Sequence, residues 1–171
     1  MRRLFILLLA LSPTPVAFAQ TTGDTLPTRR AGQWDIRMQM EGRDGGPEIV
    51  ARVCTDAETE RLLMAHAMGG MGLSCRRNEV RRVGADYRIE TDCDLGGMRS
   101  QSTAVASGDF QTAYTMRIEG SVAMPGRPVQ KTLMVQQARW VGAACTGGMV
   151  PGDMETAGQR FNVRNLPRMS N

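Results

Sequence analysis

The chain has 171 residues, of which 22% are charged, and a formal net charge of +4. A chain of this length fits one domain. Its basic residues are mostly arginines spread among acidic residues, and Lys131 is the only lysine, so they do not form the clustered basic face that nucleic-acid binding requires. We therefore expect a single domain with no nucleic-acid partner.

The N-terminus has the pattern of a secretory signal. Arg2 and Arg3 precede an apolar run from Leu4 to Leu11, and the small-x-small triplet 17–19 follows. This pattern predicts a signal peptide over residues 1–19 with cleavage before Gln20, which lowers the net charge to +2. The run is too short to span a bilayer, so we expect a protein exported to the bacterial periplasm that does not span the membrane.

The first structured segments follow a polar stretch. Residues 20–31 lack periodicity and predict a flexible leader. Residues 33–40 alternate strictly between apolar and polar side chains, and Ile49, Ala51 and Val53 then mark a second strand that ends near Cys54. Alternation with a period of two is typical of strands with one wet face. We expect these two segments to pair as a hairpin.

A helix is predicted next. Thr55-Asp56-Ala57-Glu58 has the form of a capping box, and the helix is expected to run to Met68, where Gly69-Gly70 ends it. Its apolar stripe is predicted to comprise Leu62, Ala65 and Met68.

The segment from Cys75 to Cys93 predicts a hairpin that turns at Gly84-Ala85, since glycine takes the positive φ of a type II′ turn. That turn places Val80 opposite Ile89 and Arg76, rather than Cys75, opposite Cys93. An offset of one residue sends a side chain to the other face of a sheet. Cys75 and Cys93 are therefore expected not to bond to each other.

Three further strands complete the pattern. Residues 98–107 and 110–120 predict another hairpin, and residues 131–141 predict the last strand. Beyond Cys145 the periodicity is lost, so residues 146–171 are expected to be a mostly irregular tail with at most one short helix near Asp153.

Seven strands in hairpins and one helix predict a mainly β (α+β) domain over residues 32–145. An odd number of strands would make the first and last strands parallel in a closed sheet. We therefore expect a curved, open antiparallel sheet with the helix packed on its concave face.

Four segments in order resemble the family known as domain of unknown function 3617. They are Gly32-Gln33-Trp34-Asp35-Ile36-Arg37-Met38-Gln39-Met40, Cys54-Thr55-Asp56-Ala57-Glu58, the cysteine-bracketed hairpin 75–93, and Arg139-Trp140-Val141-Gly142-Ala143-Ala144-Cys145. The resemblance covers residues 32–145. It departs at Ala143-Ala144, where one acidic residue is usual. The resemblance implies a small exported bacterial protein, and it supplies no functional residue.

The four cysteines, Cys54, Cys75, Cys93 and Cys145, favour two disulfides in an exported protein. Their spacing lacks the closely spaced CxxC pairs that are typical of a zinc site. The sequence leaves three connectivities open. We favour Cys54 with Cys75, which would fasten the helix to the sheet, and Cys93 with Cys145.

Met64, His66, Met68 and Met71 form a cluster of soft ligands suited to Cu(I), which makes a periplasmic copper-binding protein the alternative function. In a regular helix Met64 and Met68 share a face and His66 points elsewhere. The favoured interpretation is that these methionines pack in the core.

The leading hypothesis is a non-catalytic binding or structural module that needs no cofactor. His66 is the only histidine, and no nucleophile elbow, phosphate loop or metalloprotease motif is present. Methionine and aromatic residues gather on one sheet face, which predicts a site for a small apolar ligand or a protein partner unless they simply fill the core. These residues are Trp34, Met38, Met40, Tyr87, Phe110, Tyr114, Met116 and Trp140.

Overall fold

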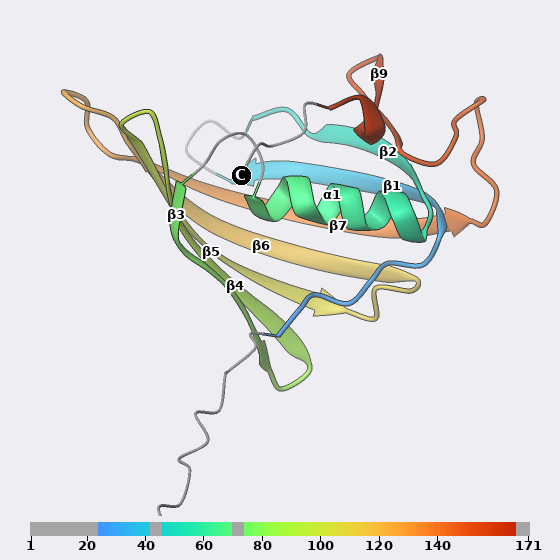
Figure 1. Cartoon of the computed structure of the whole chain (residues 1–171), viewed down its shortest axis with the longest axis horizontal. Helices are drawn as coiled ribbons and strands as arrows, with labels where there is room; N and C mark the ends of the chain where they lie inside the picture. Colours follow the sequence, from blue (N-terminus) through green and yellow to red (C-terminus); the bar gives the residue numbers. More distant parts are fainter. Residues whose placement is uncertain (1–23, 42–45, 70–73, 167–171) are drawn as a thin grey trace, which may run out of the picture.

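The computed structural model describes residues 24–41, 46–69 and 74–166 (Figure 1). The predicted signal peptide, residues 1–19, lies outside the described residues. The elements are β1 (Gly32–Glu41), β2 (Ile49–Thr55), α1 (Ala57–Gly69), β3 (Ser74–Val83), β4 (Asp86–Leu95), β5 (Met98–Gly108), β6 (Ala113–Ala123), β7 (Gln130–Gly142), β8 (Asp153–Thr156), β9 (Gln159–Asn162) and the 3-10 helix η1 (Val163–Asn165). No helix within these residues is long and apolar enough to cross a membrane.

The strands form one sheet in the order β3-β4-β5-β6-β7-β1-β2-β8-β9, and every neighbouring pair is antiparallel. The sheet is open, because β3 and β9 are its two edges. Figure 1 shows that it curves strongly and that α1 crosses its concave side. The expected fold class is confirmed, with two strands more than predicted.

The position of α1 follows from the strand order. Strand β2 lies on one side of the sheet and β3 is the far edge, and five strands separate them. The chain must therefore cross the sheet between these two strands, and α1 makes that crossing over the concave face (Figure 1). This connection encloses the space between helix and sheet.

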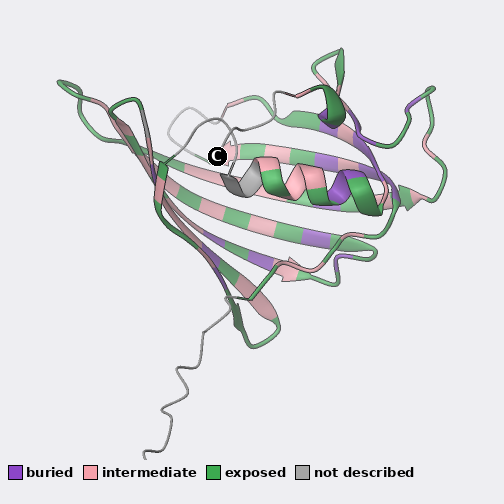
Figure 2. Cartoon of the chain, in the orientation of Figure 1, coloured by how far each residue is buried: buried purple, intermediate pink, exposed green. Residues whose placement is uncertain are grey.

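The core lies beneath the N-terminal part of α1, where the buried residues gather (Figure 2). Trp34 is completely buried, and Phe110 and Tyr114 are also buried. The rings of Phe110 and Tyr114 stack with centroids 4.9 Å apart, and Trp34 lies 5.8 Å from Tyr114. Aromatic groups bury large apolar areas and dominate core energetics, so this cluster fixes one end of the concave face.

Residues 24–31, which we call the N-terminal arm, belong to the segment expected to be a leader; residues 24–30 have no regular secondary structure, but the arm makes contacts with the domain. The arm crosses one end of the sheet (Figure 1). The backbone N–H of Arg30 donates to the carbonyl oxygen of Phe110 at 3.1 Å, and the indole N–H groups of Trp34 and Trp140 donate to the carbonyl oxygens of Arg30 and Ala31. The arm lacks periodicity because tryptophan side chains and a loop, rather than a neighbouring strand, satisfy its backbone.

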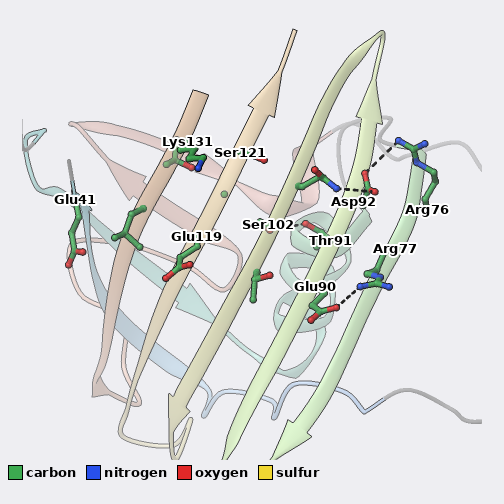
Figure 3. A pocket seen from close by; sticks show the side chains of 15 residues that line it. Glu41, Arg76, Arg77, Glu90, Thr91, Asp92, Ser102, Glu119, Ser121 and Lys131 are labelled. Atoms are coloured by element: carbon green, nitrogen blue, oxygen red, sulfur yellow. Dashed lines mark hydrogen bonds and ion pairs between the residues drawn. The ribbon is translucent and has the colours of Figure 1, made fainter. Parts of the chain in front are cut away.

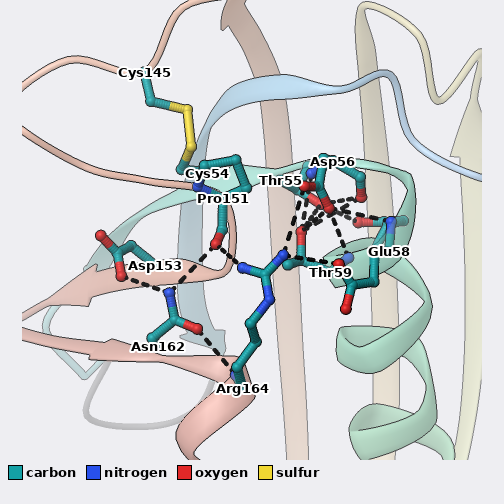
Figure 4. A network of polar contacts seen from close by, with 11 residues as sticks. Cys54, Thr55, Asp56, Glu58, Thr59, Cys145, Pro151, Asp153, Asn162 and Arg164 are labelled. Carbon is teal, nitrogen blue, oxygen red and sulfur yellow. Dashed lines mark hydrogen bonds and ion pairs between the residues drawn. A yellow bond between two sulfur atoms is a disulfide. The ribbon is translucent and has the colours of Figure 1, made fainter.

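The tail after Cys145 also differs from the expected irregular chain. Strand β8 pairs with the free edge of β2, and β9 and η1 follow it. Arg164 then returns to the start of α1, where its guanidinium contacts Glu58 at 3.0 Å and Asp56 at 3.7 Å and donates to the carbonyl oxygen of Pro151 (Figure 4). Strands of four residues are too short to show an alternating pattern, which explains why the sequence did not reveal them.

The start of α1 is capped by Asp56 rather than by Thr55. The Asp56 carboxylate accepts hydrogen bonds from the backbone N–H groups of Glu58 and Thr59, and the Thr59 hydroxyl accepts one from the N–H of Asp56 at 2.9 Å. These reciprocal bonds make a capping box one residue later than predicted. They lower the pKa of Asp56, and the backbone bond from Thr59 contributes most.

The helix also presents a different face from the predicted stripe. Ala65 is exposed and Leu62 is only half-buried, whereas Glu60 is buried and Leu63 packs against the core. The side chain of Met68 lies outside the described residues. An apolar stripe in the sequence could not predict that Glu60, a charged residue, is buried.

Both predicted disulfide pairings are wrong, although two disulfides are present. The structure joins Cys75 to Cys93, with Cα atoms 3.9 Å apart, and Cys54 to Cys145, with Cα atoms 5.8 Å apart. The predicted pairing of Val80 with Ile89 is confirmed, but a bulge between Cys75 and Arg77 moves the register by one residue and brings Cys75 opposite Cys93. A bulge inserts one unpaired residue into a strand, and here that residue is Arg76.

The second disulfide follows from the strand order at the other side. Gln33 on β1 pairs with both Cys54 on β2 and Gly142 at the end of β7. The chain beyond Gly142 therefore needs only to pass the end of β1 to bring Cys145 to Cys54. The order of the predicted hairpins along the sequence could not show that β1 lies between β2 and β7.

Candidate functional site

The candidate site is a cavity of about 390 Å³ between α1 and the concave face of the sheet. Strands β1, β2, β4, β5, β6, β7 and β8, helix α1 and the N-terminal arm all contribute to its wall. Ligand cavities usually have volumes of about 300–1,000 Å³. The cavity is reached from solvent, because wall residues such as Met38, Met116 and Gln136 are only half-buried.

Most of the wall is apolar. Isoleucines, alanines and methionines from the strands face Leu63 and Met64 of the helix, and the arm contributes Leu26 and Pro27. The methionines in the wall are Met38, Met64, Met116 and Met154. Methionine is unbranched and polarizable, so a wall of this kind can adapt to the shape of an apolar molecule.

A buried ion pair joins the arm to the helix at the cavity. The Nε and Nη2 atoms of Arg29 donate to the two carboxylate oxygens of Glu60 at 2.8 and 2.7 Å, and the Thr55 hydroxyl donates to Glu60 at 3.2 Å. The side chains of Arg29 and Glu60 are 10% and 2% exposed. Burial opposes the charge of Arg29, but the interactions with Glu60 and Tyr114 together outweigh it and raise the Arg29 pKa.

Neutral polar groups in the wall are paired with each other. The hydroxyl groups of Thr91 and Ser102, on neighbouring strands, lie 2.8 Å apart. The Gln136 amide donates to the phenol oxygen of Tyr114 at 3.0 Å. Because these groups bond to each other, their hydrogen-bonding capacity stays satisfied next to an apolar ligand, which offers no donor or acceptor.

A tight turn places Phe110 in the wall. Phe110 has a φ of 56°, which is unusual for a large side chain. The carboxylate of Asp109 accepts hydrogen bonds from the Thr112 hydroxyl and from the backbone N–H groups of residues 111–113. These bonds hold the turn, and the hydroxyl bond from Thr112 is the main reason that the Asp109 pKa is lowered.

The residues of the predicted methionine and aromatic face take different places. Met38, Phe110, Tyr114 and Met116 line the cavity, while Trp34 lies in the solid core and Tyr87 packs against that core. Trp140 is covered by Arg30, whose guanidinium carbon lies 3.8 Å from the ring centroid. Met40 is half-buried and does not line the cavity. Part of the face fills the core, and the rest leaves a space.

Only two of the four predicted copper ligands have side chains among the described residues. Met64 lines the cavity and His66 is half-buried. The side chain of Met68 and the whole of Met71 lie outside the described residues. The structure adds no observation in favour of a copper site, which stays a prediction.

A second hollow lies on the opposite face of the sheet. It is larger than the cavity, but its wall does not favour one class of ligand. It has a volume of about 1160 Å³ and is lined by charged side chains of both signs (Figure 3). Arg77 pairs with Glu90 at 2.7 Å, and Asp92 pairs with Arg99 at 2.6 Å and Arg76 at 3.7 Å. Within these pairs the positive and negative charges compensate each other, so this face offers no binding site that favours a ligand of one charge.

The glycine and tryptophan residues of the recognised motifs support the cavity from outside. Gly32 has a φ of 123°, and a Cβ atom there would lie 2.2 Å from the carbonyl oxygen of Gly142. This close approach lets Trp34 and Trp140, which pair across β1 and β7, both reach the arm. The motif residues therefore fix the arm that carries Leu26, Pro27 and Arg29 into the wall.

A model of a family described as protein of unknown function (DUF3617) matches residues 29–145. The chain belongs to this family. The DUF3617 match begins within the arm and ends at Cys145, which confirms the resemblance seen in the sequence. Met154 in the cavity wall comes from β8, outside the match. No curated protein and no solved structure matches the chain.

Sequence reasoning missed Arg29 and Glu60. Arg29 lies in a segment without periodicity, and Glu60, an acidic residue in the first turn of α1, was not part of the predicted apolar stripe. One signal was available, because Glu60 follows the capping residue Asp56 by one helical turn, close to where the helix meets β2.

Proposed function

We propose that this DUF3617 protein is an exported, non-catalytic domain that binds a small apolar molecule in the cavity between α1 and the sheet. The cavity carries the proposal: its volume suits a small ligand, and its wall combines a largely apolar surface with a few paired polar groups. The wall also presents no adjacent nucleophile and base among the described residues, which supports a binding role rather than catalysis.

The proposed location outside the cytoplasm rests on two observations. Residues 1–19 have the pattern of a secretory signal. All four cysteines are joined in disulfides, which form and persist in oxidising compartments. An intact mass that corresponds to a chain starting at Gln20, measured on protein from the periplasmic fraction, tests this part of the proposal.

Native mass spectrometry of the protein purified from its own host tests the binding role. We expect a bound small molecule that is released on unfolding. Ala104→Met should remove it, because Ala104 is buried in the cavity wall. Val105→Met is the matched control, because Val105 is the next residue along β5 and is 37% exposed on the other face.

The proposal is refuted if the unmodified protein carries no small molecule and takes none from an extract of the host's cell envelope. It is also refuted if Ala104→Met, folded as judged by its circular dichroism, retains as much ligand as Val105→Met does. That second result would place the ligand elsewhere on the protein.

A further inference from the structure

The charges in the cavity wall limit the ligand that it can take, provided that the proposed binding function holds. Among the described residues of the wall, Arg29 and Glu60 are the ones with acidic or basic side chains of the Arg, Lys, Asp and Glu types. Both carboxylate oxygens of Glu60 accept hydrogen bonds from Arg29. The positive and negative charges therefore compensate each other within the wall.

The two charges of this pair already compensate each other, so neither is available as the sole counter-ion of a charged ligand. Glu60 is 2% exposed and also accepts a hydrogen bond from Thr55, while Arg29 presents its bidentate edge to Glu60. A ligand carboxylate that bound the remaining N–H groups of Arg29 would stand beside Glu60, so that one buried positive charge would face two negative charges. Leaving a buried charge unpaired is strongly unfavourable.

The other polar groups of the wall are neutral and have partners. Thr91 pairs with Ser102, and Gln136 pairs with Tyr114. A charged group that entered the cavity would exchange water for an apolar wall and these occupied groups. Desolvating an ion without a compensating charge is far more costly than desolvating an uncharged group.

We infer that the cavity selects uncharged apolar molecules, and that the buried Arg29–Glu60 pair enforces this selectivity by presenting no net charge. The pair thus acts on specificity as well as joining the arm to the helix. Loss of one member should convert the cavity into a site with an unpaired charge.

Two fluorescent probes with the same skeleton test this inference. N-phenylnaphthylamine is uncharged, and anilinonaphthalenesulfonate differs from it by one sulfonate group. Titration of the unmodified protein should show saturable binding of N-phenylnaphthylamine, with a Kd at least about tenfold lower than that of the sulfonate, because the sulfonate would be buried without a counter-ion.

Glu60→Gln isolates charge from the size of the sulfonate group. The amide keeps the shape of the carboxylate but leaves Arg29 without a counter-ion, so the ratio of the two Kd values should shift toward the sulfonate by at least about tenfold. Glu90→Gln is the matched control. It removes the same charge from the opposite face, where Glu90 pairs with Arg77 and Arg88, and should leave the ratio unchanged.

The outcomes separate the inference from the proposed function. If both probes bind the unmodified protein equally, or if the ratio is unchanged in folded Glu60→Gln, the charge selectivity is refuted while apolar binding stands. If neither probe binds saturably, the proposed function itself fails. Should Glu60→Gln not fold, the ratio measured on the unmodified protein still decides the inference.

Discussion

Removing the carboxylate of Glu60 should destabilise the protein more than removing any exposed carboxylate. In Glu60→Ala the guanidinium of Arg29, which is 10% exposed, would stay buried without its counter-ion, and the Thr55 hydroxyl would lose an acceptor. Breaking a buried pair by removing one partner costs about 3–5 kcal/mol. A domain is stable by about 5–15 kcal/mol, so the loss would be a large share of the total.

Urea denaturation followed by tryptophan fluorescence measures this loss, since Trp34 and Trp140 both contact the arm that Arg29 belongs to. Glu90→Ala is the control, because its partner Arg77 has a side chain that is 53% exposed, and exposed pairs contribute little. A free energy of unfolding that falls no further in Glu60→Ala than in Glu90→Ala would refute the account of the buried pair.

The double variant Arg29→Met with Glu60→Leu separates charge from packing. Apolar replacements of a buried ion pair are often neutral or stabilising, so this variant should recover most of the stability lost in Glu60→Ala. If it is as unstable as Glu60→Ala, the loss comes from the shape of the side chains and not from the unpaired charge.

Three further predictions follow from the fold. Gly32→Ala should lower the free energy of unfolding by about 1–3 kcal/mol or more, since the φ of Gly32 is 123° and a Cβ atom there would meet a carbonyl oxygen. Gly84 has open space around it, so Gly84→Ala should lower the free energy of unfolding by less, and urea denaturation of both variants tests the comparison. Non-reducing peptide mapping should recover the Cys54–Cys145 and Cys75–Cys93 pairs, and replacing each pair with alanine should cost about 4.6 and 3.2 kcal/mol if chain entropy dominates, because the loops span 91 and 18 residues. The Arg99 hydrogen bond lowers the pKa of Asp92 to about 2 from an ordinary value of 3.8, so the contribution of Asp92 to stability should be present above pH 4 and lost as the pH falls toward 2. The free energy of unfolding, measured as the pH is lowered, should therefore fall less in Asp92→Asn than in the unmodified protein, and an equal or larger fall would contradict this.

The hairpins could be predicted because their sequence pattern is local. Strand alternation and the glycine turn gave the partners of β3 and β4 correctly as far as Arg77 and Asp92. The register then failed at Arg76, because a bulge has no signature in apolar and polar alternation. A shift of one residue was enough to reverse the predicted disulfide pairing.

The arm and the tail could not be predicted, because long-range contacts rather than local patterns order them. The arm is held by tryptophan N–H groups and by Glu60, and β8 by the edge of β2. The cavity was predicted in part, since the apolar concave face was expected. The charged pair in its wall was not, because a buried glutamate looks like any exposed one in the sequence.

The pairing of β1 with β7 has a consequence for how the chain folds. Strands β3 to β7 form a meander of neighbouring hairpins, and β1 and β2 form another, so each can assemble from nearby residues. The seam between them joins residues about one hundred positions apart, such as Ile36 and Ala138, and closing so long a loop is slow. We expect refolding to be limited by this closure, and refolding kinetics should show it: a preformed Cys54–Cys145 bridge, which spans the same seam, should accelerate refolding relative to the reduced chain.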